Sequence, residues 1–389
     1  MKPIRCLLWF ISLSLPLWTL AQESVVFTSG QEGYASFRIP AIIKSGENHL
    51  IAFAEGRVDH AGDFGNVDIV YKISTDNGKH WSPLQVLVDY QQLQAGNPAP
   101  VVDFLDKRYP KGRIFLFYNT GNNHEGEVRK GNGWREVWYV TSIDGGKSWS
   151  SPQSITQQVH KIYQPSAHPD FQFKEDWRTY ANTPGHGFQM MSGPHKGRIY
   201  IAANHNAGDP QPGNKDWNAH AYYSDDHGAS FKLSDPIPFP SSNESTAAQI
   251  GPKSVYMSSR NQGYLPRQRI VSRSNDGGST WISSHTDPNL PDPINQGSVL
   301  SWKSGRKFIL AHCNTADTNR RDQLTLRLSK DGGKTWYWNQ IIAQSPAGYK
   351  GSAFAAYSDL VQLNGNTLGV LYEKDNYQQI VFRPVSIAN

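Results

Sequence analysis

The chain has 389 residues, of which 38% are hydrophobic and 12% aromatic, and it contains 34 Gly and 24 Pro. This composition favours a large β protein with many turns and argues against a helical bundle or a disordered chain. The formal net charge of +5 includes no run of Lys or Arg, so nucleic acid has no support as a partner and a small anionic substrate fits better.

The first segment of the chain has the pattern of a secretory signal peptide. Lys2 and Arg5 precede an apolar run that leads to a cleavage site after Ala21. We expect residues 1–21 to be removed on export to the periplasm or the medium, and the run is too short for a stable membrane anchor. Residues 22–389 are then expected to form one domain, with the single cysteine Cys313 and no internal disulfide.

Short alternating runs recur along the rest of the chain, and each stands just before a copy of one motif. The runs are "VDIVYKI", "REVWYVT", "AHAYY", "RQRIVSR" and "QLTLRL", and their alternation predicts β-strands. The motif copies are "STDNGKHW", "SIDGGKSW", "SDDHGASF", "SNDGGSTW" and "SKDGGKTW", which begin at Ser74, Ser142, Ser224, Ser274 and Ser329. Intervals of about 50 to 80 residues between the copies indicate propeller blades with loop insertions.

Each motif copy has the chemistry of a hairpin turn. Its Ser and Asp side chains can cap turn amides, its glycines allow a positive φ, and its aromatic residue anchors the turn in the core. A calcium site needs about six to eight oxygen ligands and each copy offers one or two carboxylates, so we expect no metal. We therefore predict a structural role for five aspartates, Asp76, Asp144, Asp226, Asp276 and Asp331.

A further motif, "FRIPAII" from Phe37 to Ile43, gives the repeats a more specific meaning. Together with the five copies, which are Asp boxes, it resembles the bacterial exo-α-sialidases, or neuraminidases, over nearly all of the chain after the leader. The resemblance implies a six-bladed β-propeller that hydrolyses terminal sialic acids with retention of configuration and without a cofactor. The implied partners are sialylated glycoproteins, glycolipids and oligosaccharides, and the oligomeric state stays open.

Sialic acid carries a carboxylate on its anomeric carbon, and the family holds this group with three arginines. The matching residues are Arg38 in "FRIP", Arg260 in "MSSRNQG" and Arg321 in "NRRDQLTLRLS". Guanidinium groups suit the task because their N–H donors can bind a carboxylate with two parallel hydrogen bonds. The neighbouring Arg320 is the alternative to Arg321, since only the register of the motif separates them.

The nucleophile of the family is a tyrosine, which "AFAAYSDL" supplies as Tyr357. A carboxylate nucleophile would be repelled by the carboxylate of the substrate, whereas a neutral phenol would not. Because the unperturbed pKa of tyrosine is about 10, the phenol needs a base. The resemblance assigns this role to Glu244 in "SSNESTAAQ".

The remaining implied roles concern proton transfer and support. Asp63, in the glycine-rich loop "VDHAGDFGNVD", matches the acid/base that protonates the leaving group, and Asp59 is the alternative. Arg57 of "AEGR" matches the arginine beside a ring hydroxyl of the sugar. Glu373 of "GVLYEKD" matches the glutamate that orients the first arginine.

Two other classes of function stay open on the sequence. The same mechanism serves enzymes that transfer sialic acid, release an anhydro product or act on a deaminated sialic acid. A propeller that binds glycans without cleaving them would be expected to lack one or more of Tyr357, Glu244 and Asp63, and all three are present. We therefore favour an exo-α-sialidase.

Overall fold

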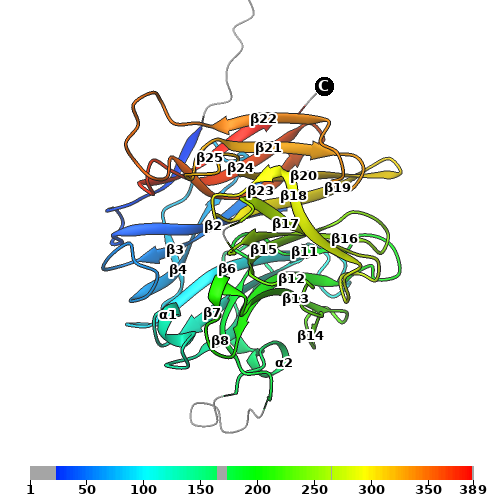
Figure 1. The fold of residues 1–389 in the computed structure, drawn as a ribbon. Helices are drawn as coiled ribbons and strands as arrows, with labels where there is room; N and C mark the ends of the chain where they lie inside the picture. The colour runs from blue at the N-terminus through cyan, green and yellow to red at the C-terminus, as the bar shows by residue number, and fades with distance from the viewer. Residues whose placement is uncertain (1–22, 164–172, 264, 388–389) are drawn as a thin grey trace, which may run out of the picture.

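The computed structural model describes residues 23–163, 173–263 and 265–387 (Figure 1). The predicted signal peptide, residues 1–21, lies outside the described residues. Almost all the regular structure is β-strand, which confirms the all-β expectation. The helical elements of the described ranges are short: α1 (Glu125–Val128), α2 (Thr156–Val159) and a 3-10 turn (Pro212–Asn214). None of the helices in these ranges has the length and apolar character needed to span a membrane.

The strands form five mostly antiparallel sheets. The largest sheet contains β2 (Ser36–Gly46), β3 (His49–Arg57), β4 (Val67–Ser74), β5 (Gln85–Val88), β6 (Gln94–Asp103), β7 (Arg113–Gly121), β8 (Arg135–Ser142) and β9 (Gln153–Ser154). The next sheet contains β10 (Trp177–Asn182), β11 (Phe188–Gln189), β12 (Ile199–Ala207), β13 (Trp217–Ser224) and β14 (Lys232–Leu233).

Three sheets of four strands complete the fold. One contains β15 (Ser242–Gln249), β16 (Val255–Asn261), β17 (Gln268–Ser274) and β18 (Ser283–Pro291). Another contains β19 (Gly297–Ser304), β20 (Lys307–Thr315), β21 (Leu324–Ser329) and β22 (Trp338–Ala343). The last contains β23 (Ala355–Asn364), β24 (Thr367–Lys374), β25 (Gln379–Ser386) and the N-terminal β1 (Ser24–Thr28).

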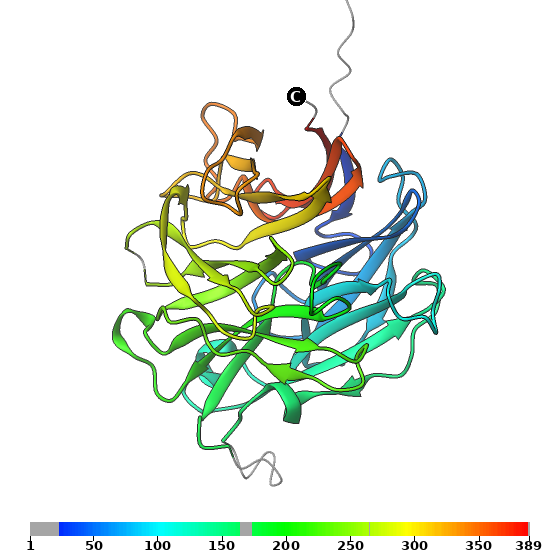
Figure 2. The same ribbon diagram turned by 90° about the vertical axis from the view of Figure 1, so that its right-hand side faces the viewer.

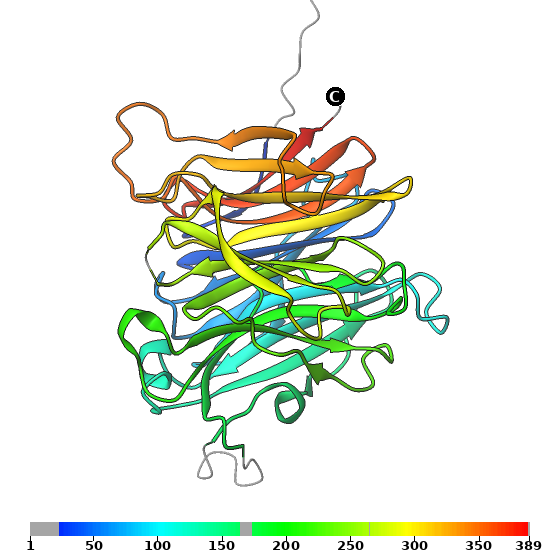
Figure 3. The same ribbon diagram turned by 45° about the vertical axis from the view of Figure 1, so that its right-hand side comes forward.

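The sheets follow one another round the molecule and the ring closes on itself. β1 pairs antiparallel with β25, so the first strand of the described chain completes the last sheet. In Figure 2 the colours run round the ring from blue through green and yellow to orange, and the red strands return beside the blue one. Figure 3 shows successive sheets lying one above another across the view. A closed ring of antiparallel sheets is a β-propeller.

The five Asp boxes lie in turns that follow β4, β8, β13, β17 and β21. In the box after β8, Asp144 accepts the hydroxyl of Ser142 at 2.8 Å and the backbone N–H groups of Lys147 and Ser148 at 3.0 Å. Ser142 in turn accepts the backbone N–H of Gly146 at 2.9 Å. The aspartate therefore holds the turn by satisfying its amides.

The same boxes fasten neighbouring parts of the ring to each other. Gly78, at a φ of 85°, lies against Phe382 of β25, and Gly228, at 84°, lies against Phe115 of β7. Neither position has room for a Cβ atom, and a positive φ favours glycine in any case. The corresponding pairs in the other boxes are Gly146 with Ile51, Gly278 with Tyr200 and Gly333 with Tyr256.

Candidate active site

A charged pocket of about 220 Å³ lies where β2, β6, β15 and β23 begin. Its wall contains all seven residues for which the sialidase resemblance implies a catalytic or substrate-binding role: Arg38, Arg57, Asp63, Glu244, Arg260, Arg321 and Tyr357. These residues are distant in the sequence, and the ring of sheets brings them to one place. Their chemical roles stay predictions at this point.

A second, larger cavity of about 650 Å³ is lined by later residues of the same strands and by residues of β19, including Ile42, Val101, Ala247, Leu300 and Leu360. Its wall is mostly apolar and contains none of the seven residues. Binding of an anionic sugar requires converging charged donors. Of the two cavities, the smaller pocket is therefore the candidate active site.

Tyr357, Glu244 and Arg260 form one hydrogen-bonded group on the pocket wall. Tyr357 donates its hydroxyl to Oε1 of Glu244 at 2.5 Å. Arg260 donates Nη1 to Oε2 of Glu244 at 2.8 Å and to the hydroxyl oxygen of Tyr357 at 3.0 Å. The carboxylate can thus accept the phenol proton, and the guanidinium can stabilise the phenolate that remains.

The protonation state of Tyr357 follows from its surroundings. Burial and the Glu244 carboxylate raise the pKa of Tyr357 far above its ordinary value, against the opposing influence of Arg260, Arg321 and Arg38. The tyrosine is therefore a neutral phenol in the free protein. Transfer of its proton to Glu244 would leave a phenolate, which is the nucleophilic form of this side chain.

Arg38 owes its position to Glu373, which is fully buried on β24. One oxygen of Glu373 accepts Nε of Arg38 at 2.7 Å and the N–H of Ile39 at 3.0 Å, and the other accepts the N–H of Tyr357 at 3.2 Å. Burial disfavours the Arg38 cation, but the charge of Glu373 outweighs it and raises the pKa of Arg38. One carboxylate therefore fixes both an arginine and the backbone of the tyrosine.

The structure separates the two neighbouring arginines of "NRRD". Arg321 lines the pocket, where Nη1 donates to the hydroxyl of Tyr377 at 2.9 Å and Nη2 to the carbonyl of Ile294 at 3.3 Å. Arg320 is not among the lining residues, and its guanidinium pairs with Asp322 at 2.7 Å. Of the two, Arg321 is the residue that faces the pocket.

Asp63 lies on the loop between β3 and β4, with 71% of its side chain exposed. It accepts Nη1 of Arg57 at 2.8 Å, and Glu55 holds Arg57 from the other side at 2.7 Å. Desolvation would raise the pKa of Asp63, but Arg57 and Arg38 outweigh it and lower the pKa. Asp63 is therefore an ionised carboxylate in the free protein. Asp59, the alternative, does not line the pocket.

Several polar residues of the pocket wall were given no role from the sequence: Glu55, Asn97, His124, Glu125, Arg135 and Asn204. Glu55 has a signal in hindsight, because it stands two residues before Arg57 and side chains two apart share a face of a strand. Glu125 belongs to α1, inside the long connection between β7 and β8. A single helical turn shows no periodicity, so the sequence held no sign of it.

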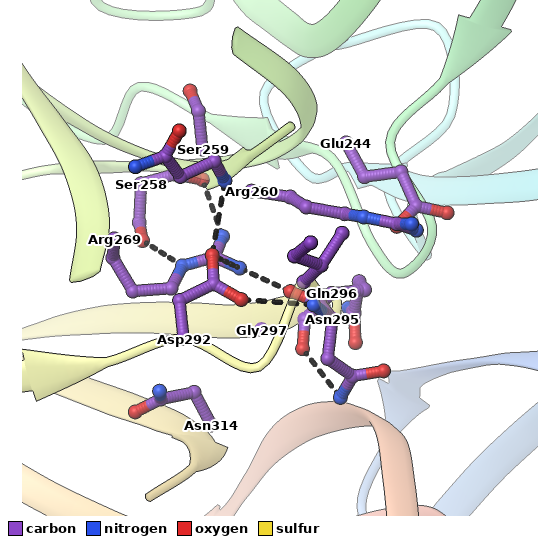
Figure 4. A network of polar contacts seen from close by, with 12 residues as sticks. Glu244, Ser258, Ser259, Arg260, Arg269, Asp292, Asn295, Gln296, Gly297 and Asn314 are labelled. Carbon is purple, nitrogen blue, oxygen red and sulfur yellow. Dashed lines mark hydrogen bonds and ion pairs between the residues drawn. The ribbon is translucent and has the colours of Figure 1, made fainter. Parts of the chain in front are cut away.

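Behind the pocket, a buried polar network joins β16 and β17 to the loop before β19 (Figure 4). Arg269 lies 3.6 Å from Asp292 and donates to the carbonyl of Asn295. Asp292 accepts the backbone N–H groups of Asn261 at 3.0 Å and Asn295 at 2.8 Å. Because Asn261 follows Arg260 directly, the network fixes the strand end that carries this pocket arginine.

The Asp-box aspartates, Asp76, Asp144, Asp226, Asp276 and Asp331, are not in the pocket wall. Within the described ranges, another acidic group, formed by Asp103, Asp106 and His227, has the spacing of metal ligands. Arg108 and Arg113 pair with Asp106 at 2.8 and 3.3 Å, so this carboxylate already has cationic partners. This group also lies outside the pocket wall.

Fold and site together define a β-propeller with a charged pocket, in which three arginines lie beside a tyrosine that is hydrogen-bonded to a glutamate. The profile of the BNR repeat-like domain family matches residues 48–370, and the chain belongs to this family.

Relatives with sialidase names extend over most of the chain. Over 380 residues the chain is 29% identical to a sialidase of Micromonospora viridifaciens, covering 92% of this chain and 52% of that protein. It is 27% identical over 373 residues to an exo-α-sialidase of Arthroderma benhamiae, covering 89% and 80% of the two chains. The chain thus spans about half the length of the bacterial relative and most of the fungal one.

Solved structures show the same fold. The Hadza microbial sialidase Hz136 superposes with a TM-score of 0.75 at 22% identity, covering 94% of this chain and 68% of that chain. A leech intramolecular trans-sialidase superposes with a TM-score of 0.71 at 16% identity, covering 95% and 71% of the two chains. These similarities place the chain among propellers of the sialidase type by architecture.

Proposed function

We propose that this chain is an exo-α-sialidase, a glycoside hydrolase that releases terminal α-ketosidically linked sialic acids from glycoconjugates with retention of configuration. The observation that carries the proposal is the bonded pair of Tyr357 and Glu244 in one pocket with Arg38, Arg260 and Arg321. The sialidase names of the relatives support it. A protein that merely binds glycans has no need for a tyrosine already bonded to a base.

The first step in this proposal is recognition of the carboxylate of the sugar. Arg38, Arg260 and Arg321 each carry a full positive charge into the pocket wall. Their N–H groups hold the anomeric carboxylate, which orients the anomeric carbon toward Tyr357. Binding energy from this contact is thereby used to align the reacting atoms.

The chemistry proceeds in two half-reactions. Tyr357 attacks the anomeric carbon while its proton passes to Glu244, the bond to the glycosidic oxygen breaks, and this oxygen takes a proton from Asp63. Water then attacks the same carbon and gives a proton to Asp63, and the bond to Tyr357 breaks as the proton returns from Glu244. Two inversions at one carbon give overall retention.

Asp63 must be protonated before it can act as an acid, and Arg57 and Arg38 oppose this in the free protein. A bound substrate carboxylate offsets the charge of Arg38, which removes one cause of the lowered pKa. The exposed loop also allows Asp63 to exchange Arg57 for the glycosidic oxygen. Protonation of the acid is thus coupled to binding of the substrate in this proposal.

We also infer that the propeller has six blades. The eight-stranded sheet counts as two blades, because β4 and β6 share one parallel pairing, between Val67 and Gln94. Residues of six strands, β2, β6, β11, β15, β19 and β23, line the larger cavity. Residues 22–389 form this propeller domain in the proposal, and the protein acts in the periplasm or outside the cell.

The direct test is the release of 4-methylumbelliferone from its α-sialoside by the purified protein. The proposal predicts release by the wild-type protein and none above background by Glu244→Gln, which keeps the size of the side chain but not its basicity. A folded wild-type protein that releases no fluorophore would contradict the proposal.

A further inference from the structure

A tyrosine outside every motif, Tyr377, contacts two of the three proposed carboxylate-binding arginines. Its hydroxyl accepts Nη1 of Arg321 at 2.9 Å, and the guanidinium carbon of Arg38 lies 4.0 Å from the centre of its ring. Tyr377 is not part of the pocket wall. Any effect on a ligand must therefore pass through the arginines.

The turn that carries Tyr377, between β24 and β25, has an unusual backbone. Asp375, Asn376 and Tyr377 have φ values of 51°, 52° and 68°, three consecutive positive values without a glycine. Such conformations disfavour residues with a Cβ atom and persist where surrounding contacts impose them. A glycine would adopt this turn without strain. The contact that Tyr377 makes with the arginines accounts for the presence of a tyrosine there instead.

The surrounding contacts tie this turn to the backbone of Arg321. Residues 352–354 accept the N–H groups of Asp375 at 2.8 Å and Asn376 at 2.6 Å. The same segment accepts the N–H of Arg321 at 3.3 Å and, through Phe354, donates to its carbonyl at 2.9 Å. The hydroxyl of Tyr377 and the guanidinium of Arg321 are thus held in register by one shared stretch of chain.

The second terminal nitrogen of Arg321 has a fixed acceptor as well. It donates to the carbonyl of Ile294, a β-branched residue at a φ of 65°. The buried pair of Arg269 and Asp292 holds the loop that contains Ile294, as Figure 4 shows for the neighbouring Asn295. Both acceptors of Arg321 therefore belong to residues whose backbone is held by other contacts of the fold.

Charge distinguishes Arg321 from the other two arginines. Arg38 is paired with Glu373 and Arg260 with Glu244, whereas among the ion pairs of the described residues Arg321 has no carboxylate partner. A glutamate beside Arg321 would compete with the carboxylate of a ligand for the same donors. A neutral phenol orients the guanidinium without offsetting its charge.

We propose that Tyr377 is a positioning residue of the carboxylate site, whose hydroxyl sets the direction of Arg321 and whose ring supports Arg38. This inference rests on the proposed sialidase function of the same pocket. Tyr377 would then contribute to the specificity of the site for a carboxylate, which would explain the strained turn that carries it.

The test compares Tyr377→Phe and Tyr377→Leu with the wild-type protein and with Tyr349→Phe as the matched control. Tyr349 bonds to the carbonyl of Ala353 and interacts with Asp375 at the start of the turn, so its variant removes a hydroxyl beside the turn without removing the one that Arg321 contacts. The probes are 2-deoxy-2,3-didehydro-N-acetylneuraminic acid and its uncharged carboxamide. The measurements are Ki for each probe, and KM and kcat with a fluorogenic sialoside.

Tyr377→Phe should raise Ki for the acid and KM by about fivefold to tenfold, which is the effect of one ordinary hydrogen bond, with kcat within about twofold. Ki for the carboxamide should stay unchanged. Tyr377→Leu, which also loses the ring, should show a larger rise in Ki for the acid, and Tyr349→Phe should match the wild type.

An unchanged Ki for the acid in both Tyr377 variants, or an equal rise for the acid and the carboxamide, would overturn the inference while the wild-type activity leaves the proposed function intact. A wild-type protein that neither binds the acid nor cleaves the sialoside would instead refute the proposed function, and the inference with it.

Discussion

Glu373→Gln tests whether one buried carboxylate holds the site together, because it removes the counterion of Arg38 and nearly keeps the shape. Arg38 is 8% exposed and Glu373 0%, so water cannot replace the lost charge. Breaking a buried ion pair by removing one partner costs about 3 to 5 kcal/mol. The glutamine carbonyl can still accept the two hydrogen bonds that one oxygen of Glu373 accepts, which places the expected loss at the lower end, about 3 kcal/mol.

This loss converts into a measurable shift in melting temperature. With an unfolding entropy of about 2.1 cal/mol/K per residue, a domain of this size loses roughly 1.3 °C per kcal/mol, so Tm should fall by about 4 °C. The kcat/KM for a fluorogenic sialoside should fall at least about tenfold, because Arg38 and the backbone of Tyr357 lose their shared acceptor. Scanning calorimetry and initial rates give the two values.

The matched control is Glu127→Gln, which removes an exposed ion pair with Lys130 whose two side chains are 42% and 60% exposed. Its Tm should stay within about 1 °C of the wild type, because exposed pairs contribute little. If Glu373→Gln were as stable and as active as this control, the reasoning that Glu373 positions Arg38 would be refuted.

Three further variants test the proposed nucleophile, one Asp box and a buried histidine. Tyr357→Phe should lower kcat by at least roughly a thousandfold with little change in Tm, and near-wild-type turnover of a fluorogenic sialoside would exclude it as the nucleophile. Asp144→Ala removes the acceptor for two turn amides, so Tm should fall by about 1 to 3 °C while kcat of the folded protein stays the same. A variant of unchanged Tm that has lost turnover would contradict the structural role. Burial lowers the pKa of His220 to about 3 in the folded state. As pH falls from about 6.5 to 3, this histidine is protonated in the unfolded chain but stays neutral in the folded one. The free energy of unfolding therefore declines over this pH window. His220→Gln should flatten that decline in urea unfolding, and a slope equal to that of the wild type would count against it.

Local pattern was enough to predict the strands and turns of the repeats. The alternating runs before the boxes are β4, β8, β13, β17 and β21, and Ser142 and Asp144 make the turn bonds that their types suggest. The partners of the boxes were not predictable. Gly78 packs against Phe382 at the other end of the chain, and a contact between such distant segments leaves no period in the sequence.

The sequence likewise predicted some residues of the site and not others. Arg38, Glu244 and Tyr357 stand in recognisable motifs, and the fold places them in one wall. Tyr377 had no signal, because its position depends on a backbone conformation that L-residues rarely adopt and on an arginine 56 residues earlier. Propensity and alternation patterns describe regular backbone, so they cannot predict a residue that positions another one from a strained turn.

The proposed activity of the pocket is the hydrolysis of α-sialosides with retention through Tyr357. Proton NMR of α-2,3-sialyllactose during the first minutes of incubation with the protein tests it most directly. We expect lactose and free sialic acid that is released as the α anomer and converts to the β anomer afterwards. Release of the β anomer first, or formation of an anhydro sugar or a transfer product in place of free sialic acid, would contradict it.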